Sequence, residues 1–346
     1  MIKSNLMIKR FIFMAFLCLM IGFFINGCSS KKHFEPQTLS GKIHFNGKLS
    51  AAIQSVSREG AVLKDHTLLT LAQGITPLLV KKDYKFLTQN NNIFVLQKQC
   101  QEIMIIETNA AQNTPNIHTI PFDKCILSAT FKGNKLAMVL LDNTLVYYDA
   151  SKQKEIFSQK YPPVLAINSY LAAPKITSEY VIYPDLEGKI LIYSIAQNKI
   201  IKDILIISDK FFNNVIYLYA KDKYILAATA KRVSAIIDNK SFKYDVDLRD
   251  VLFFGDKVYV LSIEGEILEL DHTLKLLRKV RLPFAVLSGI IIKNNTLYTL
   301  ESGGYLIALD LKDFAPMIYK NNLAKKKSLF YNQDTFFYDK VYKRFE

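Results

Sequence analysis

The stretch GYLIALD, residues 304–310, decides the fold because close copies of it recur along the chain. It joins a turn glycine, Gly304, to an alternating apolar run that ends in Asp310. GEILELD at residues 265–271 has the same form. Alternation over this length is typical of a β-strand, and a glycine just before it is typical of a hairpin turn. The repeat therefore predicts a fold built from many copies of one hairpin.

Seven-residue windows of this form start at intervals of 33 to 45 residues, which lies around the period of a four-stranded propeller blade. The windows are HTLLTLA (66–72), QEIMIIE (101–107), NTLVYYD (143–149), GKILIYS (188–194), RVSAIID (232–238), GEILELD (265–271) and GYLIALD (304–310). Their turn and end positions are Asn143, Asp149, Gly188, Asp238, Gly265, Asp271, Gly304 and Asp310. We expect positive φ at the turn glycines and hydrogen bonds from turn amides to the closing aspartates.

One period contains four strands, which we name a to d. Residues 125–131, 135–141, 144–149 and 155–159 read as these strands, and the same order recurs from 250 to 282. Because one blade cannot bury both faces of its sheet, a ring of blades is expected. The sequence thus predicts an all-β propeller of four-stranded antiparallel blades over residues 40–346.

The number of blades follows from the chain ends. Seven units fit between residues 50 and 320. Residues 328–345 read as two further strands, and GKIHFNG (41–47) reads as another copy of the repeated phrase. Together these segments predict an eighth blade that closes the ring with N- and C-terminal strands. Seven blades with additional decoration is the alternative.

Residues 1–27 have the pattern of an export signal. A basic beginning precedes an uncharged apolar stretch at 11–24, which is too short to cross a ~30 Å hydrocarbon core. The sequence INGC (25–28) resembles a bacterial lipobox, which implies that Cys28 is acylated and that residues 28–39 form a tether. Ser29 is not the aspartate of inner-membrane retention, so the resemblance implies a periplasm-facing anchor in the outer membrane. An ordinary secretory signal is the alternative.

The chain has four cysteines. Cys18 lies in the expected signal and Cys28 is the expected lipid site, so Cys100 and Cys125 remain. Two thiols in an oxidising compartment favour a disulfide. Cys100 falls in a b–c turn and Cys125 at the start of the next strand a, and both positions lie on one face of a propeller. The alternative is a pair of unbridged small apolar side chains.

Charge and motifs restrict the function. The net charge of +14 suits anionic partners, but the lysines are scattered, and an exported protein has little access to nucleic acid. The sequence contains no GxSxG elbow, P-loop, GxGxxG or acidic calcium loop, and the five histidines lack ligand spacing. We therefore predict no catalytic residue, no metal site and no cofactor, and we expect a protein that is not an enzyme.

The turn glycine, apolar run and ALD ending at 304–310 resemble the pyrroloquinoline-quinone-type, WD40-like propeller repeat. In a lipoprotein, such repeats are similar to those of the BamB-like outer-membrane assembly lipoproteins. That resemblance implies a non-enzymatic periplasmic scaffold of the outer-membrane β-barrel assembly machinery. It also implies that loops on one propeller face bind the barrel insertase and unfolded barrel proteins. A lipid anchor would hold the protein at the membrane.

Two other functions remain open. One is a cell-envelope lipoprotein propeller that binds polysaccharide, peptidoglycan or a secretion apparatus. The other, more remote, is a quinoprotein dehydrogenase. Enzymes of that kind stack their cofactor on a tryptophan, and this chain has none.

Overall fold

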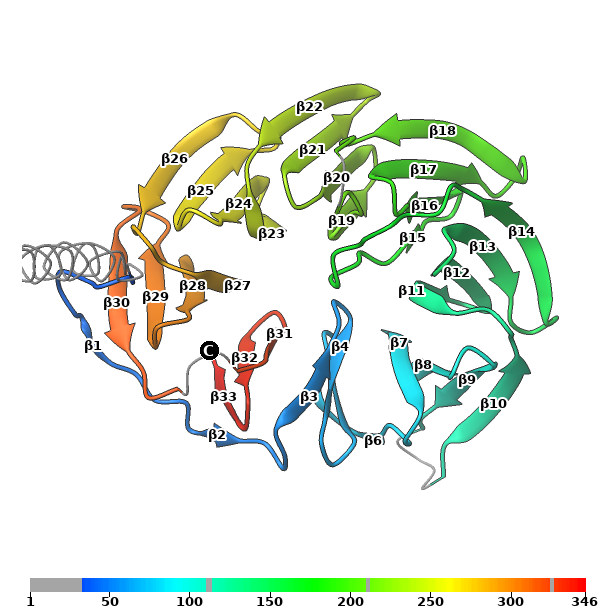
Figure 1. The fold of residues 1–346 in the computed structure, drawn as a ribbon, viewed down its shortest axis with the longest axis horizontal. Helices are drawn as coiled ribbons and strands as arrows, with labels where there is room; N and C mark the ends of the chain where they lie inside the picture. The colour runs from blue at the N-terminus through cyan, green and yellow to red at the C-terminus, as the bar shows by residue number, and fades with distance from the viewer. Residues whose placement is uncertain (1–32, 110–113, 210–211, 324–326) are drawn as a thin grey trace, which may run out of the picture. The chain divides into compact units, whose positions relative to one another are not determined.

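Eight small sheets stand side by side around a common axis, so the predicted eight-bladed propeller is confirmed (Figure 1). The computed structural model describes residues 33–109, 114–209, 212–323 and 327–346, and the propeller lies in the unit 36–346. The proposed signal at 1–27 and Cys28 lie outside the described residues. Within the described ranges all regular elements are strands. No helix long and apolar enough to span a membrane is found in these ranges.

Each of the first seven blades takes its four strands, a to d, consecutively from the chain. Blades 1 to 4 contain β3 (Ile53–Val56), β4 (Gly60–Leu63), β5 (Thr67–Thr70), β6 (Gly74–Leu79); β7 (Tyr84–Asn90), β8 (Ile93–Lys98), β9 (Glu102–Glu107), β10 (Asn116–Pro121); β11 (Ile126–Lys132), β12 (Lys135–Leu140), β13 (Thr144–Asp149), β14 (Lys154–Lys160); and β15 (Lys175–Ile176), β16 (Tyr180–Pro184), β17 (Lys189–Ser194), β18 (Lys199–Leu205). Blades 5 to 7 contain β19 (Tyr217–Lys221), β20 (Tyr224–Ala228), β21 (Arg232–Ile237), β22 (Lys240–Asp245); β23 (Leu248–Phe254), β24 (Lys257–Ser262), β25 (Glu266–Asp271), β26 (Leu276–Arg281); and β27 (Leu287–Lys293), β28 (Thr296–Glu301), β29 (Tyr305–Asp310), β30 (Pro316–Lys320).

The repeated phrase supplies strand c of every one of these blades. GYLIALD gives β29 and GEILELD gives β25, and the other five windows give β5, β9, β13, β17 and β21. Strands b and c pack between neighbouring blades, so β13 is buried at all six positions. The outermost strands face water on one side, and β18 alternates strictly between exposed and half-buried residues. Burial on two faces explains why strand c is so apolar.

The eighth blade joins the two ends of the chain. Its inner strands are β31 (Leu329–Tyr331), β32 (Thr335–Tyr338) and β33 (Val341–Arg344), and its outer strand is β2 (Gly47–Lys48). The preceding strand, β1 (Gly41–Lys42), pairs in parallel with β30 at the edge of blade 7. The N-terminal segment thus runs along the outer edges of two blades, which keeps the first and last blades together.

Two details of the predicted closure were wrong. Residues 328–345 form three strands rather than two. The prediction missed the third strand, β33, because it is only four residues long and two of these residues are charged. GKIHFNG (41–47) is not a copy of strand c. Its ends lie on the outer edges of blades 7 and 8, where alternation next to a glycine occurs without any b–c hairpin.

Candidate functional site

The propeller has two faces that differ in the segments they carry. The first face carries the b–c turns and the connections from each strand d to the next strand a, and the second face carries the a–b and c–d turns. Hydrogen bonds tie first-face turns to first-face connections. The Leu141 N–H donates to the Cys125 carbonyl over 2.9 Å, and the Ile263 N–H donates to the Asp247 carbonyl over 2.8 Å. The first face is therefore a surface in which turns and connections support each other.

Seven exposed large apolar side chains lie in the first-face turns and connections between blades 3 and 7. The most exposed are Leu165 at 93%, Phe284 at 53% and Phe212 at 52%. Two connections there, 161–174 and 282–286, contain no charged residue. We name as the apolar sector the residues Leu141, Leu165, Tyr170, Phe212, Ile263, Phe284 and Val286. Among the described residues of the second-face turns, Leu71 is the comparably exposed large apolar one, and Phe254, which is more exposed, ends strand β23 beside the turn at 255–256.

Two aromatic residues of the apolar sector have backbones in the left-handed region. Phe212 has φ of 60° and Phe284 has φ of 66°, values that cost free energy for a bulky side chain. Leu274 and Phe314 also have positive φ, but both are buried, so packing compensates for the backbone cost. At Phe212 and Phe284 the strained backbone holds an aromatic ring half exposed to water.

A buried polar cluster joins distant blades near the axis. The turn between β3 and β4 reaches toward the centre of the ring (Figure 1) and carries Arg58. The Arg58 guanidinium lies 3.2 Å from the Asp250 carboxylate and 5.3 Å above the ring of Tyr217, and the Tyr331 hydroxyl donates to Asp250. Burial alone would lower the pKa of Arg58. Tyr331 and Asp250 act in the opposite direction and the net shift is upward, so Arg58 stays charged. These groups satisfy one another, which suits a structural link between blades.

Asp185 is a buried carboxyl group in the b–c turn of blade 4. It is 1% exposed, and its Oδ1 accepts from the backbone N–H groups of Glu187 at 3.0 Å and Lys189 at 2.7 Å, while Oδ2 has no partner. Burial, with a smaller contribution from Glu187, raises the pKa of Asp185 to about 7. This carboxyl therefore changes charge near neutral pH, in a turn that is hydrogen-bonded to the connection between blades 4 and 5.

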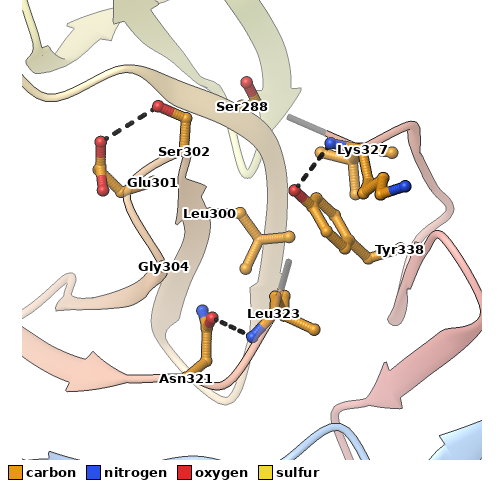
Figure 2. Close-up of a pocket in the computed structure, with 10 residues that line it drawn as sticks. Ser288, Leu300, Glu301, Ser302, Gly304, Asn321, Leu323, Lys327 and Tyr338 are labelled. Atoms are coloured by element: carbon orange, nitrogen blue, oxygen red, sulfur yellow. Dashed lines mark hydrogen bonds between the residues drawn. The ribbon is translucent and has the colours of Figure 1, made fainter. Parts of the chain in front are cut away.

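Clefts open between several pairs of neighbouring blades. A cleft of about 510 Å³ lies between blades 5 and 6. Another, of about 90 Å³, lies between blades 7 and 8, where Leu300, Leu323 and Tyr338 face one another (Figure 2). The Asn321 Oδ1 accepts from the Leu323 N–H across 3.1 Å at its edge. The second cleft has room for waters or a very small group but not for a protein segment.

The positions predicted from the sequence lie where turns begin or end. Gly188, Gly265 and Gly304 precede strand c with φ of 95°, 79° and 104°, and Asn143 does so with φ of 62°. Asp149, Asp271 and Asp310 end strand c, and each accepts a backbone N–H two residues ahead. Asp238 lies just after β21, in the c–d turn. These residues shape hairpins and do not converge on one site.

The two predicted bridge cysteines lie on the first face. Cys100 and Cys125 form a disulfide with an S–S distance of 1.95 Å. It links the b–c turn of blade 2 to the connection that enters blade 3. Across the described residues, no three His, Cys, Asp or Glu side chains are placed to hold a metal ion.

Sequence reasoning missed both the apolar sector and the axial cluster. A usable signal existed for the first, since YPPVLAINSYLAAP (161–174) is a long uncharged connection between charged blades. Arg58 gave no signal, because an arginine in a turn normally reads as solvated.

No protein-family model matches the chain. It is 32% identical over 383 aligned residues to the plasminogen-binding protein PgbB of Helicobacter pylori strain J99, covering 95% of this chain and 70% of that protein. PgbB of H. pylori strain 26695 is likewise 32% identical, over 381 residues, covering 94% of this chain and 70% of the relative.

Among solved structures, BamB from Moraxella catarrhalis superimposes with a TM-score of 0.64 at 11% identity, covering 86% of this chain and 98% of BamB. The C-terminal WD40 domain of Sif2 gives a TM-score of 0.59 at 12% identity, with 86% and 98% covered. At such low identity these likenesses establish the fold alone.

Proposed function

The chain belongs to the family of the plasminogen-binding protein PgbB, and from this we propose that it is a non-enzymatic protein-binding scaffold of the cell envelope. It holds a protein partner on the first face of the propeller. The partner proposed first is plasminogen, which the name of the relatives supplies. The anchor proposed for it is a lipid on Cys28 in the outer membrane. A propeller that binds plasminogen must face the outside of the cell, whereas the orientation toward the periplasm belongs to the barrel-assembly candidate below.

The apolar sector is the observation that carries this proposal. Exposed apolar patches on soluble proteins mark interaction sites, and aromatic anchors dominate the energy of protein interfaces. Phe212 and Phe284 are held half exposed at a backbone cost, which a solvated loop has no reason to accept. The uncharged connection 161–174 supplies the depletion of charge that is found at interface centres.

The test is binding of the full-length, detergent-extracted protein to immobilised plasminogen. We expect the triple variant Leu165→Asn, Phe212→Asn and Phe284→Asn to bind at least about tenfold more weakly, since buried aromatic anchors contribute ~2 kcal/mol or more each. Asparagine tolerates positive φ, so the fold is preserved at Phe212 and Phe284. The matched control replaces three exposed residues of outer strands, Leu79, Ile117 and Met317, by threonine. Equal binding by the two variants would contradict the proposal.

Barrel assembly is the second candidate, favoured by the BamB-like fold together with the lipobox-like sequence at 25–28. Purified barrel insertase on a second sensor distinguishes it from the first candidate. Binding to the insertase but not to plasminogen transfers the scaffold role to that machinery. Retention on peptidoglycan sacculi alone favours the cell-envelope alternative.

A further inference from the structure

The cleft between blades 5 and 6, the inter-blade groove, opens beside the apolar sector. It has a volume of about 510 Å³, and Ser262 and Glu264 line it on either side of the half-exposed Ile263. The groove is thus continuous with the surface on which the partner is proposed to lie. It is large enough for a side chain together with part of the backbone that bears it.

The walls of the groove carry more carboxylates than cations. Arg232 Nε lies 2.5 Å from Asp245 Oδ1, and its Nη1 donates to the Ile206 carbonyl, so this cation is bound by groups of its own chain. Lys231 Nζ lies 2.5 Å from Asp209 Oδ2. Both basic side chains of the groove are therefore committed to acids of this chain.

The remaining acids are less well compensated. Glu266 is paired with Lys279 at 3.4 Å, and Glu264 with Arg281 at 3.6 Å, the latter between side chains that are more than 60% exposed. Exposed pairs of this kind contribute little. Asp247 is exposed and forms no ion pair within 4.0 Å among the described residues, although Lys231 lies close enough to attract it. The lining of the groove thus carries four carboxylates and two cations, in a chain whose net charge is +14.

The floor of the groove is apolar. Ile207, Val246 and Leu268 line it, and Leu268 is buried in the core shared by blades 5 and 6. A long cationic side chain matches this combination, because its methylene stem packs on apolar surface while its charged end remains at a polar rim. An acidic partner group would meet Asp247 and Glu264, and a purely apolar one would leave them desolvated.

We infer that the inter-blade groove receives a lysine or arginine side chain from the protein partner, with its charge beside Asp247 and Glu264. The inference rests on the proposed function and adds to it the chemistry of the partner segment. Electrostatic attraction of this kind sets the orientation of the partner and raises the association rate more than it raises affinity.

The first experiment uses a labelled eight-residue peptide of alternating lysine and leucine with blocked ends, measured by fluorescence anisotropy with the full-length protein. A glutamate–leucine peptide and an acetyl-lysine–leucine peptide are the comparison probes. We expect the lysine peptide to bind at least about tenfold more tightly than either, with a preference that weakens as salt is raised. Equal binding of all three peptides would overturn the inference.

The second experiment compares two double variants with the same change of net charge. Asp247→Lys with Glu264→Lys reverses the charge of two acids in the groove. Glu179→Lys with Asp313→Lys reverses the charge of two exposed acids in second-face turns. We expect the groove variant to lose about tenfold in affinity for the lysine peptide and for plasminogen, mainly through the association rate. The control variant, with Glu179→Lys and Asp313→Lys, should change the affinities for the lysine peptide and for plasminogen by less than about twofold. Equal losses in the two variants would show a general charge effect and overturn the inference.

The readouts separate this inference from the proposed function. Plasminogen binding that depends on the apolar sector but not on Asp247 and Glu264 sustains the scaffold proposal and refutes the groove. Lysine-peptide binding that depends on the groove, without plasminogen binding, sustains the groove and refutes plasminogen as the partner.

Discussion

The two faces of the propeller are built differently, although the same hairpin repeats around the ring. On the first face, b–c turns lie against the connections between blades. The Gly188 carbonyl accepts from the Ile206 N–H at 2.9 Å, and the Gly265 carbonyl accepts from the Leu282 N–H at 2.8 Å. On the second face, turns such as those at Gly133 and Gly255 stand apart, and a Cβ added at either glycine would meet nothing within 4 Å.

The difference shows which face is able to carry a specific surface. Two-residue turns with positive φ, such as Asn294–Asn295, satisfy the hairpin and leave little chain for anything else. The longer first-face connections are held in place by the turns beneath them, so their exposed side chains keep fixed positions. Function is expected on loops that a rigid scaffold positions.

The strongest way to break the comparison is through Arg58, a second-face turn residue that contacts distant blades. Arg58→Ala leaves the buried Asp250 carboxylate without its cation, and breaking a buried ion pair typically costs roughly 3–5 kcal/mol. We expect a loss of that size in the free energy of unfolding measured with urea. The control is Lys223→Ala in the exposed pair with Asp238, where about 0.5 kcal/mol or less is expected. A loss below about 1 kcal/mol for Arg58→Ala would mean that the axial cluster does not hold the ring.

The second prediction tests the covalent tie on the first face. The bridge between Cys100 and Cys125 spans a sequence separation of 25, which corresponds to roughly 3–4 kcal/mol in the chain-entropy model. The double variant Cys100→Ser, Cys125→Ser should lose about that much stability in urea. Wild-type protein unfolded under reducing conditions should match the variant. A variant as stable as the oxidised wild type would show that the thiols are not bridged.

The third prediction concerns the buried carboxyl under the first-face connections. Burial raises the pKa of Asp185 to about 7, so from its ordinary value near 4 up to about 7 the folded state keeps a proton that the unfolded state has lost. Stability is therefore highest at the acidic end of this window and falls as the pH rises through it, by up to about 1.4 kcal/mol per pH unit.

Asp185→Asn should remove this dependence, because the amide oxygen still accepts the two backbone N–H groups. The measurement is the free energy of unfolding of both proteins from pH 5 to pH 8. The wild type should lose stability relative to the variant across that range. Asp65→Asn is the control, because the pKa of Asp65 is lowered and its contribution is lost only in more acidic solution. A constant difference between wild type and Asp185→Asn would refute the raised pKa.

Much of the ring could be predicted from the sequence, because strand c must be buried on both sides and therefore repeats as a recognisable apolar phrase. The ring closure could be predicted only in outline, since two-residue strands such as β1 and β2 leave no alternation to detect. The apolar sector escaped because exposure is a tertiary property. Ile263 is half exposed and Ile267 is fully buried, yet both are isoleucines within the same hairpin. The axial contact between Arg58 and Asp250 joins residues 192 positions apart, which no local pattern reveals.

The smallest predicted effect compares one glycine from each face. Both Gly188 and Gly255 have positive φ, at 95° and 55°, so alanine at either position pays a backbone cost of about 1 kcal/mol. At Gly188 the new Cβ would also lie 2.6 Å from the Ile207 carbonyl oxygen, whereas at Gly255 it would meet nothing within 4 Å. The connection over Gly188 must therefore shift, and we expect Gly188→Ala to cost about 1–2 kcal/mol more than Gly255→Ala, as close packing against backbone implies.

Urea unfolding of the two alanine variants measures this difference, and plasminogen binding measures its consequence. Displacing the connection at 206–216 moves Phe212, so Gly188→Ala should also weaken binding, while Gly255→Ala should leave it unchanged. Gly255→Asn serves as the control for the backbone cost, because asparagine adopts positive φ readily and should be nearly neutral. If the two alanine variants lose equal stability and bind equally, the first face is no more tightly built than the second, and the position of its exposed side chains has no structural support.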